Sequence, residues 1–98
     1  MDNRSSNKES VKALIERYLE AYKMRDKLTS MDIEKAWPHI VGSSVAKHTS
    51  EISLKKNVLL LRFDSSIIKQ ELAYKKDEII KAVNEYFQKN VVTDILLY

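Results

Sequence analysis

Apolar residues near the beginning of the chain recur with the period of an α-helix. Between residues 11 and 22 they stand mostly three or four positions apart, the spacing that places side chains on one helical face. This apolar stripe consists of Val11, Leu14, Ile15, Tyr18, Leu19 and Tyr22. Residues 23–28 break the pattern and are interpreted as a connector. Thr29 or Ser30 then caps a second predicted helix, which ends near residue 47.

The second predicted helix contains the only proline and the only glycine of the chain. Its apolar residues keep one helical phase through the proline: Ile33, Ala36, Trp37, Ile40, Val41 and Val45. Because proline removes a backbone hydrogen bond and clashes with the preceding turn, we expect a bend near Trp37-Pro38. Gly42 either allows a close backbone approach on the packed side or marks a weak point of the helix.

Beyond His48 the helical period gives way to alternation of apolar and polar residues. Residues 51–55 alternate in this way and predict a half-buried strand. Lys56-Asn57 predicts a tight turn, because asparagine tolerates a positive φ. Residues 58–63 are apolar at most positions and predict the returning strand.

A capped helical region follows the two predicted strands. Either Ser65 or Ser66 caps it, and its apolar positions share one phase to about residue 90. Lysines interrupt this phase, so the region is either one long helix or two helices that meet at Tyr74-Lys75-Lys76. Residues 91–98 predict a third strand.

The element order is therefore α-α-β-β-α(α)-β, which predicts an α+β domain with helices packed on one face of a small three-stranded sheet. A length of 98 residues is that of one domain. We expect residues 1–7 to form a disordered N-terminus and residues 8–98 to form the single domain. The predicted structural core includes Ile33, Trp37, Val41, Gly42, Leu59, Leu61 and Leu72.

The composition argues against an enzyme. The chain has no cysteine, which excludes thiolate metal sites, disulfides and cysteine nucleophiles. The two histidines, His39 and His48, are nine residues apart on one predicted helix and point to opposite faces. Ser65-Ser66 lacks the glycines of a nucleophile elbow. We therefore expect no catalytic residue, no metal, no cofactor and no small-molecule substrate.

The sequence shows no signal for a membrane. The longest purely apolar run is the four residues 58–61, far short of a span, and the polar N-terminus is unlike a signal peptide. A cytoplasmic protein is expected.

Charge points weakly to a polyanion partner. The formal net charge is +3, and the middle of the chain is the most basic part. An exposed aromatic residue among lysines is typical of a nucleic-acid contact. The candidate nucleic-acid-binding residues are Lys55, Lys56, Lys69, Tyr74, Lys75 and Lys76. Their alternative interpretation is an ordinary solvated surface.

One face of the predicted sheet is a candidate partner surface. If Leu59 and Leu61 face the helices, the residues between them face away. This open face then carries Val58, Leu60, Leu96 and Tyr98, which we take as candidate partner-binding residues. The alternative is that the end of the first helix folds over it.

A dispersed pattern of residues resembles the DciA-like family. It begins with Trp37-x-x-x-Val41-Gly42, Val45-Ala46 and His48-Thr49, and continues with Leu59 to Phe63, Ser65-Ser66, Gln70-Glu71-Leu72, Lys76, Asn84 and Asp94-Ile95. The resemblance covers about residues 12–97. It implies a KH-like domain of a non-enzymatic, nucleoid-associated bacterial protein that assists loading or operation of the replicative DNA helicase. It also implies binding to single-stranded or branched DNA and direct contact with the helicase.

The sequence departs from ordinary KH domains at the loop that clamps backbone phosphates. No Gly-x-x-Gly is present, and Ala73-Tyr74-Lys75-Lys76 stands near that place. Two alternatives to the helicase-associated function stay open: an RNA- or ribosome-associated KH-like binding protein, and a pure protein-interaction domain.

Overall fold

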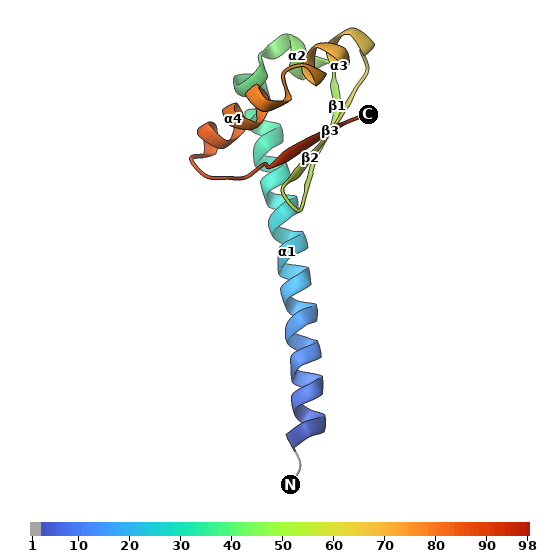
Figure 1. Ribbon diagram of the computed structural model, residues 1–98, viewed down its shortest axis with the longest axis vertical. Coiled ribbons are helices and arrows are strands. Elements are labelled where there is room, and N and C mark those ends of the chain that lie inside the picture. Colours follow the sequence, from blue (N-terminus) through green and yellow to red (C-terminus); the bar gives the residue numbers. More distant parts are fainter. Residues whose placement is uncertain (1–2) are drawn as a thin grey trace.

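The computed structural model describes the backbone of residues 3–98, with side chains from residue 10 onward (Figure 1). Its elements in chain order are α1 (Asn3–Val41), α2 (Ser43–Lys47), β1 (Thr49–Lys55), β2 (Val58–Phe63), α3 (Ser66–Ala73), α4 (Lys76–Phe87) and β3 (Asp94–Leu97). This order confirms the predicted α+β class. We expected a disordered N-terminus at residues 1–7. Residues 1 and 2 lie outside the described residues, and residues 3–7 belong to α1.

The sheet is mixed, with the strand order β1-β2-β3. β1 and β2 are antiparallel, and the turn between them, Lys56-Asn57, has φ values of 50° and 67°. Two consecutive positive φ angles are those of a type I′ hairpin turn, so the predicted tight turn is confirmed. β2 and β3 are parallel and are connected through α3 and α4.

The helical region after the hairpin is two helices, the second of the two alternatives. Ser65 caps α3, because its Oγ accepts a hydrogen bond from the backbone N–H of Ile68 at 3.3 Å. Tyr74 and Lys75 separate α3 from α4. The chain leaves α4 through Gln88 in the left-handed conformation and returns to the sheet as β3.

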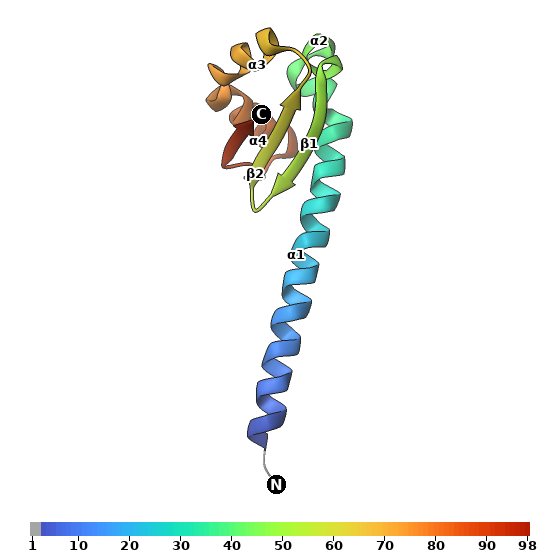
Figure 2. The same ribbon diagram turned by 90° about the vertical axis from the view of Figure 1, so that its right-hand side faces the viewer.

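The hydrophobic core lies between one face of the sheet and the helices (Figure 2). It consists of Ile33, Trp37, Leu54, Leu59, Leu61, Leu72, Ile79, Val83, Val91, Val92 and Ile95. Five of the predicted core residues are thus confirmed. Trp37 is only 1% exposed, and its indole N–H donates to Thr49 Oγ1 at 3.0 Å, so its single polar group is satisfied inside the fold.

Two predicted core positions differ from expectation. Val41 is only partly buried, and Gly42 is exposed, with no atom within 4 Å of where a Cβ would stand. Gly42 therefore allows no close approach. Its φ of +93° separates α1 from α2, a conformation that residues with a Cβ rarely adopt. The interpretation of Gly42 as a weak point of the helix is the correct one.

The connector predicted at residues 23–28 is wrong, because α1 is continuous from Asn3 to Val41. Asp26 in this stretch and Ser30 just after it bind the outer edge of the hairpin. Asp26 Oδ2 accepts from the backbone N–H of Lys56 at 3.0 Å, and Ser30 Oγ accepts from that of Leu54 at 2.7 Å. Ser30 thus caps no helix. These bonds satisfy donors that an edge strand would otherwise expose.

Pro38 lies inside α1 but close to its C-terminal end. Only one backbone hydrogen bond is lost there, and the Pro38 carbonyl still accepts from the N–H of Gly42 at 3.0 Å. The helix continues through Pro38, and it is interrupted at Gly42 instead.

The first half of α1 extends beyond the rest of the fold (Figure 1). The molecule measures 66 × 26 × 20 Å, and its radius of gyration is 18.0 Å. A compact chain of this length has a radius of gyration of about 13 Å. The sheet, α2, α3 and α4 are gathered around the C-terminal half of α1, and we call this part the body.

We predict that Trp37→Ala lowers the free energy of unfolding by about 3–5 kcal/mol, because it empties a large, fully buried aromatic site and removes the partner of Thr49. Chemical denaturation measures the loss. Tyr74→Ala is the control, since Tyr74 is 84% exposed and its removal leaves the stability almost unchanged. A loss below about 1 kcal/mol for Trp37→Ala would contradict the packing described above.

A candidate nucleic-acid interface

The candidate lysines lie at opposite ends of the sheet. Lys55 and Lys56 form the hairpin, which is bound to α1 at Asp26. Lys75 lies at the α3–α4 junction and lines a hollow of about 280 Å³ with Ile40. Asp26 and Ile40 are 14 residues apart on α1, or about 21 Å at 1.5 Å per residue. The structure therefore does not bring the predicted residues together as one patch.

The α3–α4 junction carries mixed charge. Tyr74 is 84% exposed and free of the core, as the prediction of a contact residue requires. Lys75, however, shares its hollow with Glu71 and Glu78. Carboxylates that line the same hollow weaken the attraction of the junction for phosphate groups. Lys69, on α3, is exposed.

The hairpin end gathers more positive charge than the sequence indicated. Six basic residues from three segments line or border two clefts on either side of Asp26, with Glu34 also lining the second cleft, and we call the six basic residues the hairpin-end cluster. Its members are Lys23, Arg25 and Lys27 of α1, Lys55 and Lys56 of the hairpin, and Lys89 after α4. Two clefts of about 350 Å³ and 450 Å³ adjoin α1 here, and Asp26 and Leu54 line both of them.

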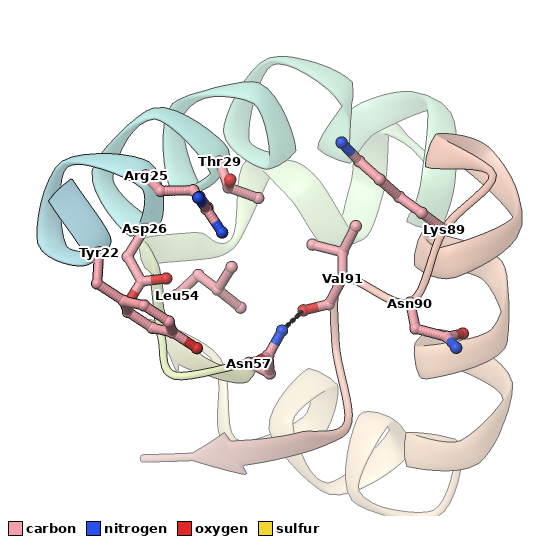
Figure 3. Close-up of a pocket in the computed structure, with 9 residues that line it drawn as sticks. All are labelled: Tyr22, Arg25, Asp26, Thr29, Leu54, Asn57, Lys89, Asn90 and Val91. Carbon is pink, nitrogen blue, oxygen red and sulfur yellow. Dashed lines mark hydrogen bonds between the residues drawn. The ribbon is translucent and has the colours of Figure 1, made fainter. Parts of the chain in front are cut away.

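The first of these clefts has two cationic walls (Figure 3). Arg25 extends into it from α1, and Lys89 extends into it from the segment after α4. Leu54 and Val91 form its apolar floor, and the ring of Tyr22 borders its outer end. Asn57 does not point freely into this space, because its side-chain N–H donates to the Val91 carbonyl at 2.9 Å. The cleft thus combines two cations with one half-buried aromatic ring.

The acidic residue of the cluster is engaged with the backbone. Asp26 accepts the hydrogen bond from the N–H of Lys56, which holds the hairpin against α1. From residue 10 onward the structure contains two ion pairs, His48–Asp64 at 2.8 Å and Arg62–Glu51 at 3.7 Å. Neither involves the cluster. Among the described side chains, none of its cationic groups forms an ion pair, although Glu34 lines the second cleft beside them.

Sequence reasoning missed Lys23, Arg25, Lys27 and Lys89 as site residues. They are far from the hairpin along the chain and reach it only through tertiary packing. One local signal was present: Lys23 and Lys27 are four residues apart, which is one face of a helix, but the connector interpretation concealed it.

The open face of the sheet carries the predicted apolar residues. In the register, Leu60 lies opposite Leu96, while Leu59 and Ile95 of the same strands are buried on the other face. Leu96 is 50% and Tyr98 46% exposed. Residue Val58 shares this face and is partly buried.

Helix α1 covers only one margin of the open face. The larger cleft lies there, between Met31 of α1 and Ser53 of β1, and Leu60 lines it. At the far margin, the Arg62 guanidinium lies 4.9 Å from the ring centre of Tyr98. The first helix therefore covers the open face only beside β1 and leaves Leu96 and Tyr98 half exposed.

The described side chains offer no cluster of three metal-ligating groups. His48 is hydrogen-bonded to Asp64, and His39 is exposed. No helix within residues 3–98 has both the length and the apolar character to cross a membrane.

Comparison with known proteins identifies a family. The model of the family described as "Dna[CI] antecedent, DciA" matches residues 10–97. No curated protein and no solved structure gives a match.

Proposed function

We propose a function for this chain on the basis of its family. The chain belongs to the DciA family, because the family model spans nearly its whole length. Proteins of this family are non-catalytic loaders of the replicative DNA helicase, DnaB. The proposal concerns how this chain contacts DNA and the helicase. We propose that it acts in the cytoplasm, at the nucleoid.

DNA binds at the hairpin-end cluster through its phosphate groups. The observation that supports this proposal is that six cations from three segments line or border two adjoining clefts, and none of them forms an ion pair with a described carboxylate. Phosphate contacts position DNA without reading its sequence, so binding is non-specific. The expected Kd is about 10⁻⁴–10⁻⁶ M at physiological salt.

The cleft between Arg25 and Lys89 favours a single strand. Bases of single-stranded DNA are free to stack on aromatic rings, and Tyr22 borders this cleft. A duplex keeps its bases stacked internally and offers only its phosphates to the same cations. The proposed substrate is therefore single-stranded DNA or the single-stranded part of a branched structure.

The helicase binds the open face of the sheet. This face presents two half-exposed apolar side chains, Leu96 and Tyr98, beside Leu60. An exposed apolar surface that polar residues border is typical of a protein-binding site. The hairpin-end cluster and the open face adjoin at Lys55 and Leu60, which line one cleft, so DNA and helicase bind side by side.

The first test compares charge reversal at the two ends of the sheet. We expect Lys55→Glu/Lys56→Glu to weaken binding to a labelled single-stranded oligonucleotide at least about tenfold, because two phosphate contacts become repulsive. Loss of two contacts also makes the negative slope of log K against log salt concentration shallower by about 1.4. Fluorescence anisotropy at two salt concentrations measures both quantities.

The matched control is Lys75→Glu/Lys76→Glu, the same change at the α3–α4 junction. We expect it to alter the affinity by less than about twofold, because carboxylates already surround this junction. If the junction variant loses affinity and the hairpin variant does not, the DNA site is at the junction. A stronger affinity for structured RNA than for DNA at equal salt would favour the RNA-binding alternative.

The second test concerns the open face. We expect Leu96→Asp to weaken binding to the bacterial replicative helicase at least about tenfold, because it places a charge at the centre of an apolar contact. The fold is retained, since Leu96 is already half exposed. Calorimetry or biolayer interferometry measures the affinity. Ile67→Asp, at a residue that is 70% exposed on α3, is the control. Equal binding by both variants would remove the open face from the helicase contact.

A further inference from the structure

The extended half of α1 exposes a line of large apolar side chains. Five of them are 53–68% exposed: Val11, Leu14, Ile15, Tyr18 and Leu19. Together with the half-buried Tyr22, we call them the N-terminal stripe. Their remaining accessible surface is on the order of 500 Å², within the range of the largest apolar patch on a typical monomer. None of the described body elements covers this stripe (Figure 1).

The N-terminal stripe continues the face of α1 that is buried in the body. Eighteen residues make five turns of an α-helix, so residues 18 positions apart lie on the same face. Ile15 therefore shares a face with Ile33, and Leu19 shares one with Trp37. Ile33 and Trp37 are 0% and 1% exposed. The same apolar face is thus packed at one end of the helix and unpacked at the other.

The spacing of the N-terminal stripe is symmetric. Its residues stand at 11, 14, 15, 18, 19 and 22, and the intervals read the same in either direction about the midpoint between residues 16 and 17. Two such helices in antiparallel orientation match each other, with Ile15 of one copy opposite Tyr18 of the other and Val11 opposite Tyr22. A twofold interface requires this kind of self-complementarity.

The position of the body excludes the parallel orientation. The body lies on the face of α1 that carries Ile33 and Trp37, which is the face of the stripe. Two parallel helices that joined their stripes would bring both bodies to the same end and into the same space. In the antiparallel orientation the two bodies lie at opposite ends, and the contact is confined to residues 11–22, because Asp26 and Ser30 farther along the helix already hold the hairpin.

We propose that two copies of this chain associate through their N-terminal stripes as an antiparallel helix pair. The two stripes together bury on the order of 1,000 Å², close to the lower limit of a specific protein–protein interface. Such an interface gives a reversible dimer, with a Kd on the order of 10–100 µM. The covering partner is a second copy because the symmetric spacing supplies both halves of the contact.

The test measures the mass of the full chain by sedimentation velocity from about 10 µM to about 500 µM. We expect the mass to rise from the monomer value of 11.4 kDa towards twice that value. Ile15→Glu/Leu19→Glu should stay monomeric throughout. The control Ala13→Glu should dimerise normally, because residue 13 lies about 200° around the helix from residue 15.

The thermal unfolding of these variants shows whether the body is intact. We expect all of them to unfold at the temperature of the unmodified chain when each is monomeric, since the changed residues, Ala13, Ile15 and Leu19, are exposed and outside the core. A monomeric unmodified chain at the highest concentration overturns the proposal, as does a dimer that persists in Ile15→Glu/Leu19→Glu. Loss of helicase binding in that variant, with an unmodified chain that stays monomeric, would assign the stripe to the helicase.

Thiol cross-linking tests the orientation. The chain has no cysteine, so single cysteines react without background. We expect a mixture of the Val11→Cys and Tyr22→Cys chains to cross-link with a short bis-maleimide much faster than either chain alone, because residues 11 of the two copies are about 16 Å apart along the antiparallel pair. Equal cross-linking by Val11→Cys alone would show a parallel dimer and overturn the proposed arrangement.

Discussion

The attachment of the hairpin to α1 is the interaction on which the remaining structure depends. The apolar face of α1 packs Ile33 and Trp37 into the core, and Trp37 has its indole N–H bound to Thr49 at the start of β1. Farther back along the helix, Ser30 and Asp26 accept hydrogen bonds from the backbone of the hairpin. The outer edge of β1 is thereby covered, and an edge strand that would otherwise pair with other chains is protected. The register of the hairpin along α1 is fixed at both ends.

This attachment also decides where positive charge collects. Asp26 keeps its negative charge while its Oδ2 holds the Lys56 backbone, and among the described side chains it forms no ion pair with a lysine or arginine. The turn between two strands, the middle of α1 and the segment after α4 consequently meet with their cations unpaired. The proposed function in DNA binding rests on this structural arrangement and not on any single basic run in the chain.

The sequence was sufficient for elements whose signals are local. Alternation defined residues 51–55 as part of a strand, Asn57 marked the hairpin turn, and Trp37 was assigned to the core because of its helical phase. It was insufficient where a polar residue finds its partner far along the chain. Asp26 was interpreted as part of a connector and Ser30 as a helix cap, because their partners, Lys56 and Leu54, are 30 and 24 residues away. The hairpin-end cluster was missed for the same reason, since Arg25 and Lys89 meet only in three dimensions.

The polar residues at the middle of α1 give its two halves different roles. Arg25, Asp26 and Thr29 lie on the same helical face as Ile15 and Ile33, and they line the cleft beside the hairpin. They interrupt an apolar face that would otherwise run the length of the helix, so the core and the N-terminal stripe are separate surfaces. In an antiparallel pair centred between residues 16 and 17, the two Asp26 positions are 19 residues apart, or about 28 Å along the helices. In the dimer Tyr22 would pack against Val11 of the second copy, so DNA would contact the cations of the two hairpin-end clusters without stacking on Tyr22. The clusters would lie at a fixed distance, and a single DNA strand long enough to reach both would bind more tightly than two separate strands.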